Sequence, residues 1–352
     1  MKHVFRSLAA WPLPLLHALG WLLGWLSWLG SPSYRRRWAC NTGLAGVTGA
    51  ARWASIGEAG KLSAELPRLW LGRPVPWRWD GSEHIEAARQ AGQGMLFLTP
   101  HLGCFEIAAQ AYATSFGLGP DARPMTVLYR PPRQTWLREL VEASRARPGL
   151  ATAPTTLAGV RQLIVALKRG EAVGLLPDQV PPEGQGLWAP FFGQPAYTMT
   201  LSARFARLPN TRVLLAWGER LSWGRGYVVH ILPLEQVLDA PLAGDMSELT
   251  AQINLAMERV IARCPQQYLW GYARYKSPRS AARGRAPPAQ GGSRARGPRP
   301  RVPARGGGHH PHRDAVAPPG VAPARAHPLR REVLVHRRPR RPAGRGPAVA
   351  GG

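Results

Sequence analysis

Two residues of the stretch TPHLGCFE (residues 99–106), His101 and Glu106, could together carry out acid–base chemistry. A carboxylate that accepts the N–H of one imidazole nitrogen leaves the other nitrogen free to accept a proton. Such a pair can activate a hydroxyl group as a nucleophile, an effect on the order of 10²–10⁴ in rate. The pair therefore predicts a general base. The alternative is a histidine that caps a helix beside a solvated glutamate.

The elements around this pair must bring the two side chains together. On one unbroken helix, residues five positions apart lie roughly 140° from each other around the axis. The apolar run GMLFLTP (94–100) predicts a buried strand, and LGCFEIAAQAYA (102–113) predicts a helix. We therefore expect His101 on the turn between them and Glu106 in the first turn of the helix, with Gly103 allowing the tight bend.

Strands and helices alternate from residue 94 onward. Further strands are predicted at 125–130, 172–177, 211–220 and 225–233, and helices at 133–146, 156–170 and 245–264. Asp245 opens the last helix with Glu248 three residues later, which is the spacing of a capping box. This alternation predicts an α/β fold with a mostly parallel central sheet flanked by helices.

Polar residues follow two more of these strands. Arg130 and Arg133 come after MTVLY, and Asp178 and Glu183 come after AVGLLP. Ligands of α/β proteins bind at the carboxyl ends of parallel strands. Together with His101, these residues predict one shared site at that edge of the sheet.

The charge of the 352-residue chain is unevenly distributed. Residues 279–352 hold 17 Arg, no Lys and two acidic residues, so this tail carries +15 of the net +26 and leaves a moderate +11 elsewhere. The tail has no Phe, Tyr or Trp, and it is predicted to be disordered because it cannot bury enough apolar surface. A frameshift or read-through product is one interpretation of the tail; an arm that binds RNA or phospholipid is the other.

The N-terminal segment is apolar. Residues 9–29 contain no Asp, Glu, Lys or Arg, and 21 helical residues span about 31 Å, roughly one hydrocarbon core. The segment predicts a membrane helix; two prolines and a histidine in its first half keep an interfacial helix as the alternative. The arginines at 35–37 place the following chain in the cytoplasm by the positive-inside rule.

Several classes of chemistry find no support in the sequence. Cys40, Cys104 and Cys264 are scattered, without the spacing of a disulfide framework or a zinc site. No G-x-G-x-x-G, Walker-type or G-x-S-x-G motif is present. We therefore expect neither a metal nor a cofactor. Cys104 could in principle act as a nucleophile, but the predicted chemistry needs no covalent intermediate.

The ordered blocks HLGCFE, LYRPP, LLPDQVPPEGQGLWAPFFG and AYTM resemble those of the bacterial lipid A biosynthesis acyltransferases, the late (lauroyl or myristoyl) acyltransferases of the glycerolipid acyltransferase superfamily. The resemblance covers about residues 5–278. That family carries either Asp or Glu at the position of Glu106, but Val180 stands where its third block often has a second acidic residue. Composition and the resemblance together predict three parts: a membrane segment (1–37), an acyltransferase domain (38–278) and the tail (279–352), which the resemblance leaves unexplained.

The resemblance also implies a reaction. A fatty acyl group would pass from acyl carrier protein to a hydroxyl of a Kdo-bearing lipid A precursor, on the cytoplasmic face of a bacterial inner membrane. His101 and Glu106 would be catalytic. Arg130 and Arg133 would bind the oxyanion or the anionic groups of the acceptor. Asp178 and Glu183 would hold sugar hydroxyls or those arginines; a structural ion pair is the alternative for both.

Other functions stay open at this point. Acyl transfer to a lysophospholipid, an ornithine lipid or another glycolipid would use the same site. A basic nucleic-acid-binding protein is a remote alternative that depends on the tail, and no nucleic-acid partner is expected. Phe191, Phe192 and Trp188 could line the slot for the acyl chain, although we expect them in the core.

Overall fold

The computed structural model describes residues 2–129 and 147–278 of the chain. These residues all belong to the first of the two units into which the chain divides, Met1–Pro288. Arg130, Arg133, the helix predicted at 133–146 and the tail from residue 279 lie outside the described residues.

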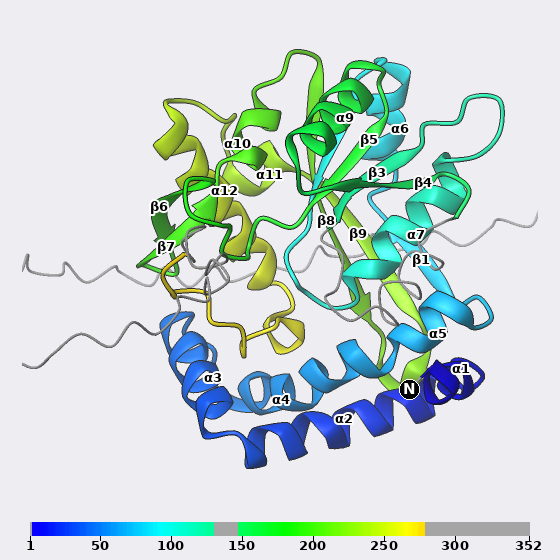
Figure 1. Cartoon of the computed structure of the whole chain (residues 1–352), viewed down its shortest axis with the longest axis vertical. Coiled ribbons are helices and arrows are strands. Elements are labelled where there is room, and N and C mark those ends of the chain that lie inside the picture. Colours follow the sequence, from blue (N-terminus) through cyan, green and yellow to red (C-terminus); the bar gives the residue numbers. More distant parts are fainter. Residues whose placement is uncertain (1, 130–146, 279–352) are drawn as a thin grey trace, which may run out of the picture. The chain divides into compact units, whose positions relative to one another are not determined.

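A seven-stranded sheet forms the centre of this unit (Figure 1). Its spatial order is β1-β9-β8-β2-β5-β3-β4, and every neighbouring pair is parallel except β8 and β9. The predicted mostly parallel sheet is therefore confirmed. The strands are β1 (Trp77–Asp80), β2 (Gly94–Leu98), β3 (Met125–Tyr129), β4 (Leu150–Pro154), β5 (Ala172–Leu175), β8 (Thr211–Arg220) and β9 (Tyr227–Pro233).

Helices cover both faces of the sheet, because the strands are apolar on both sides. Along β2, Leu96 and Leu98 belong to one core cluster and Met95 and Phe97 to the other, which is the two-residue period of a strand. The first face carries α9 (Leu157–Lys168), α10 (Leu201–Ala206), α11 (Leu234–Leu238) and α12 (Met246–Ile261). The second carries α5 (Leu66–Leu71), α6 (Glu83–Gln90) and α7 (Phe105–Phe116).

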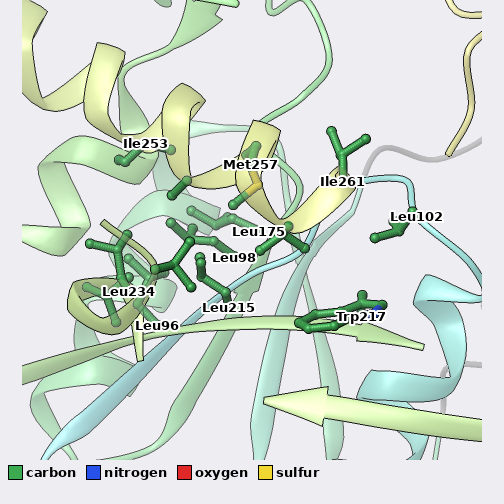
Figure 2. Packing of buried hydrophobic residues seen from close by; sticks show 14 of the residues in the cluster. Leu96, Leu98, Leu102, Leu175, Leu215, Trp217, Leu234, Ile253, Met257 and Ile261 are labelled. Atoms are coloured by element: carbon green, nitrogen blue, oxygen red, sulfur yellow. The ribbon is translucent and has the colours of Figure 1, made fainter. Parts of the chain in front are cut away.

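The core of the first face is built on α12. Ile253, Met257 and Ile261 follow one another at four-residue spacing and are buried, so they form one stripe of the helix. Figure 2 shows this stripe above Leu98 and Leu175 of two neighbouring strands. The capping box predicted for this helix is confirmed: the Asp245 side chain accepts from the backbone of Ser247 and Glu248, and Glu248 returns a bond to the backbone of Asp245.

The N-terminal helices α1 (Lys2–Ala9), α2 (Leu13–Gly30), α3 (Pro32–Leu44) and α4 (Gly49–Ala64) precede the sheet. The apolar segment predicted at 9–29 is thus broken before Leu13, and its prolines lie at the beginning of α2. Helix α2 packs along α4 (Figure 1). A Cβ atom on Gly60 would come within 1.9 Å of the carbonyl oxygen of Gly20, so small residues permit this close approach.

Two strands fall outside the sheet. The stretch GLWAPFFGQPAYTM forms a hairpin of β6 (Gly186–Phe191) and β7 (Gln194–Met199). Phe192 and Gly193 at its tip both have positive φ, as a two-residue turn of this hand requires. Phe191 is buried in the core and Phe192 packs against it, as expected. Trp188 is half exposed, so the expected core position is wrong for this residue. Strands β1 and β4 and this hairpin were not among the predicted elements.

Candidate active site

His101 lies on the turn between β2 and α7, as the sequence predicts. Gly103 makes this turn possible. Its φ is +59°, and a Cβ atom there would lie 2.0 Å from the carbonyl oxygen of Gly218 on β8. Only glycine fits both the conformation and the space. The turn therefore holds the imidazole at the carboxyl end of β2, where it remains partly accessible.

Asp178 holds both the backbone and the ring of His101. It follows β5, which pairs with β2 in parallel, so the ends of the two strands meet. Its Oδ2 accepts the backbone N–H of His101 at 2.8 Å, and its Oδ1 lies 2.7 Å from the ring Nδ1. Burial alone would raise the pKa of Asp178, but the charge and hydrogen bonds of His101, and then Arg274, lower it below its ordinary value.

These contacts fix the tautomer of the imidazole. Because Asp178 is an ionised acceptor, the ring Nδ1 carries the proton and donates it. The ring Nε2 is then the basic nitrogen. The side-chain Nε2 of Gln179 lies 2.9 Å from it and donates a hydrogen bond to its lone pair. The opposite orientation of the Gln179 amide would set two acceptors against each other.

The predicted hydrogen bond between His101 and Glu106 is not confirmed. Among the described residues, the ring nitrogens of His101 bond to Asp178 and Gln179. Glu106 is in the first turn of α7, as expected, and is buried. It takes part in other interactions. Burial lowers the pKa of Arg147 below its ordinary value, and the charge of Glu106 partly opposes that shift. Asp178 thus occupies the orienting position that the sequence assigned to Glu106.

The segment Pro265–Arg274 supports the same turn from the other side. The carbonyl of Gln267 accepts the N–H of Gly103 at 3.0 Å, and the N–H of Leu269 donates to the carbonyl of His101 at 3.2 Å. The hydroxyl of Tyr272 accepts the N–H of Val180, next to Gln179. Sequence analysis gave this segment no role in the site, because nothing in its residue types indicates backbone hydrogen bonds to His101.

A buried ion pair supports the turn as well. Arg220 at the end of β8 donates to the carbonyl of Gly103 at 2.7 Å and to both carboxylate oxygens of Glu65. Glu65 is fully buried, and its Oε2 also contacts His17 of α2 at 3.1 Å. Burial raises the pKa of Glu65, but Arg220 and His17 outweigh this and lower it to about 2. Sequence reasoning missed this pair, whose members are 155 residues apart.

An apolar pocket begins beside His101. It holds about 660 Å³, including space open to solvent, and the ring of Phe105 on its wall lies 5.0 Å from the imidazole. The pocket lies between α7 and the sheet, and Glu106 contributes to its wall. Its other lining residues are mostly apolar and include Trp79, Phe97, Ala109, Tyr112, Val127 and Ile231. A long hydrocarbon chain suits such a slot.

Comparison with known proteins assigns the chain to a family. The family model described as bacterial lipid A biosynthesis acyltransferase matches residues 50–277, more than half of the chain. The chain belongs to this family. It is similar to the lipid A biosynthesis lauroyltransferase of Escherichia coli K12, with 26% identity over 222 residues that cover 62% of this chain and 68% of the relative. The palmitoleoyltransferase of the same organism is 27% identical over 199 residues, which cover 56% and 61%.

The protein is thus an acyltransferase of lipid A biosynthesis. The family match contains His101, Glu106 and Asp178, and it ends before the Arg-rich tail. It begins at residue 50, so the resemblance expected for residues 5–49 lies outside the matched range. An acyltransferase from Haemophilus influenzae is 24% identical over 190 residues, which cover 54% of this chain and 56% of that protein.

The other candidate residues, Glu183 and the cysteines, differ in how far they are exposed to solvent. Glu183 is exposed on the loop between β5 and β6. Cys104 is fully buried, and burial raises its thiol pKa well above the ordinary value, so it is unsuited to nucleophilic attack. Cys264 is also buried, whereas Cys40 on α3 is exposed.

Proposed function

We propose that this acyltransferase moves a fatty acyl group from acyl carrier protein to a hydroxyl of a Kdo-bearing lipid A precursor, with His101 as general base. The observation that carries the proposal is an imidazole of fixed tautomer, held by Asp178, beside an apolar pocket. Family membership supports the reaction class. That the donor is acyl carrier protein, and that the acceptor hydroxyl is on a lipid A precursor, are both part of this proposal.

The reaction follows from the position of the ring Nε2. The acceptor hydroxyl gives its proton to this nitrogen as its oxygen attacks the thioester carbonyl. The ring becomes positively charged as it takes this proton. The negative charge of Asp178 is already in place beside Nδ1, so the carboxylate stabilises the imidazolium as it forms. When the tetrahedral intermediate collapses, the carbon–sulfur bond breaks and His101 returns the proton to the departing thiolate. No acyl-enzyme forms.

The remaining site residues act on charge and binding. Glu106 stays in the proposed catalytic set as a second carboxylate, whose charge favours the imidazolium from the side of the pocket. Arg130 and Arg133, outside the described residues, are proposed to bind the oxyanion or the phosphates and carboxylates of the acceptor. Exposed Glu183 is proposed to bind sugar hydroxyls. The acyl chain enters the pocket beside Phe105.

The enzyme is proposed to work at the cytoplasmic face of the inner membrane. Helix α2 is the one described helix long and apolar enough to cross a bilayer. Its exposed face is apolar and includes Trp21, Leu22 and Leu26, whereas the opposite face packs on α4. We propose that this exposed face lies in lipid. Arg35 donates to the last carbonyls of α2, at Trp28 and Leu29, so this arginine also has a structural use.

Direct assay tests the proposal. The full-length protein in membranes is incubated with acyl carrier protein or coenzyme A thioesters, and with a lipid A precursor, a lysophospholipid or an ornithine lipid as acceptor. We expect transfer from the carrier-protein thioester to the lipid A precursor. In cells that lack the gene, lipid A should be lighter than in the parent by one acyl group. Transfer to another acceptor, with lipid A mass unchanged, would contradict the assigned substrate.

A further inference from the structure

Gln179 covers the basic nitrogen of His101. Its side-chain Nε2 lies 2.9 Å from the ring Nε2, the atom that must accept the proton of the acceptor hydroxyl. A lone pair that already accepts one hydrogen bond in line cannot accept the hydroxyl proton at the same time. Asp178 makes the ring Nε2 basic, and the neighbouring Gln179 blocks that same nitrogen.

The position of this amide is built into the fold. Gln179 directly follows Asp178, which is 2% exposed and bonded to His101 through both carboxylate oxygens. On its other side, the N–H of Val180 donates to the hydroxyl of Tyr272 at 3.0 Å. Both neighbours of Gln179 are thus anchored, while its own side chain is partly exposed. The backbone is fixed, and only the side-chain torsions need change to uncover His101.

We propose that Gln179 is a positioning residue that caps His101 until an acceptor hydroxyl displaces it, and that this cap suppresses hydrolysis of the bound acyl thioester. The proposal rests on the proposed function of the same site. An acceptor lipid is held by many contacts besides its hydroxyl, so its binding can displace one amide. A water molecule has no such additional contacts and competes poorly with the cap.

The suppressed reaction is simple. Without the cap, His101 would take a proton from water while the oxygen attacks the thioester carbonyl. The carbon–sulfur bond would then break, the fatty acid would be released, and the imidazolium would protonate the departing thiolate. One water and one thioester give one fatty acid and one thiol. The cap thus favours transfer over this loss of activated acyl groups.

The test measures hydrolysis of an acyl thioester without acceptor, and transfer with acceptor, for the full-length protein. In Gln179→Ala we expect hydrolysis to rise about 2- to 10-fold, the range set by the loss of one neutral hydrogen bond. The KM for the acceptor should fall or stay the same, and the kcat of transfer should stay within about threefold. Gln179→Met keeps the length but lacks the N–H donor, so it should behave as Gln179→Ala does.

Two controls separate the cap from a structural role. Gln185→Ala removes an exposed glutamine from the same loop and should leave hydrolysis and transfer unchanged. In the double variant His101→Ala/Gln179→Ala the extra hydrolysis should disappear, because it depends on the uncovered base.

The proposal is overturned if Gln179→Ala leaves the ratio of hydrolysis to transfer at the parental value, or if the extra hydrolysis survives loss of His101. Hydrolysis in Gln179→Met at the parental rate would also overturn the proposal. A side chain of the same length without an N–H donor would then suppress hydrolysis equally well, so the hydrogen bond to His101 would not be the cause. An error in the proposed acceptor would give a different result. The parent would then transfer no acyl group to the lipid precursor, but the effect of Gln179→Ala on hydrolysis would still be measurable.

Discussion

At the scale of single residues, the structure gives the carboxylates of Asp178 and Glu106 unequal positions around the imidazole of His101. Asp178 bonds to the ring Nδ1 of His101, whereas Glu106 lies on the wall of the apolar pocket. An acceptor on Nδ1 decides which nitrogen of the ring is basic, and a charge on the pocket wall does not. The two carboxylates should therefore differ in what their removal does.

We expect His101→Ala to abolish transfer and Asp178→Asn to lower kcat by about 10²- to 10⁴-fold, because an amide there can hold the ring in the wrong tautomer. Glu106→Gln should cost less than Asp178→Asn, since Glu106 does not set the tautomer. The measurement is steady-state transfer, with Asp121→Asn, an exposed aspartate, as the matched control. A larger loss in Glu106→Gln than in Asp178→Asn would restore Glu106 as the orienting carboxylate.

At the scale of elements, one buried ion pair joins four parts of the fold. Glu65 follows α4, Arg220 ends β8, His17 belongs to α2, and Gly103 is on the turn of the active site. Removing one member of a buried pair leaves an uncompensated charge, which is far more costly than the loss of a surface pair. Both the stability of the fold and the position of His101 depend on this arrangement.

Glu65→Gln should lower the free energy of unfolding by about 3–5 kcal/mol at neutral pH. Glu86→Gln, which removes the half-exposed pair with Arg89 on α6, should cost less than about 1 kcal/mol. The pKa of Glu65 falls from 4.5 to about 2 on folding. Its contribution is therefore complete above about pH 4.5 and is lost as the pH falls toward 2. The difference between parent and variant in chemical unfolding should narrow over that window; a constant difference would contradict the assignment.

The exposed face of α2 gives a second prediction at this scale. The double variant Leu22→Asp/Leu26→Asp should make the protein extractable from membranes by high salt, whereas the parent should resist salt. Both side chains are about half exposed, so the fold itself should tolerate the changes. Leu157→Asp/Val165→Asp alters two exposed apolar residues of α9 and is the matched control. If both variants resisted salt equally, lipid contact through α2 would be wrong.

At the scale of the whole molecule, the family match and the described residues end at adjacent positions, 277 and 278. Residues 279–352 carry most of the net positive charge and no aromatic residue. Within the described residues, His101 is held in place by Asp178, by the segment Pro265–Arg274 and by the Glu65–Arg220 pair. The tail is therefore not expected to contribute to the site.

Truncation after Arg279 should leave acyl transfer and membrane association at parental levels. The measurement compares specific activity and membrane-bound fraction at matched protein amounts. Binding of RNA in low salt should decrease on truncation, because polyvalent cations bind polyanions without specificity. Loss of transfer with the protein still present would show that the tail is functional and would argue against a frameshift or read-through origin.

Sequence reasoning placed the histidine on the correct turn and Asp178 at the correct edge of the sheet. Both follow from local patterns, since apolar runs predict strands and the ends of parallel strands meet at one edge. Glu106 was predicted as the partner of His101 because it is near in the sequence. In the structure, the pairing of β2 with β5 brings Asp178 next to the His101 ring instead. The Glu65–Arg220 pair could not be predicted. The sequence around each of these residues looks like that around a solvent-exposed charge, and the two residues are far apart in the chain.

The unequal burial of the three cysteines makes the wild-type chain its own reporter of membrane sidedness. Cys104 and Cys264 are buried, and burial raises the pKa of Cys264 to about 12, so neither offers a reactive thiolate to a maleimide. Cys40 is exposed on α3, just after the arginines at 35–37. A membrane-impermeant maleimide should therefore label one position per chain. With the proposed cytoplasmic orientation, inverted vesicles would expose that thiol and intact spheroplasts would conceal it, and no engineered substitution is needed.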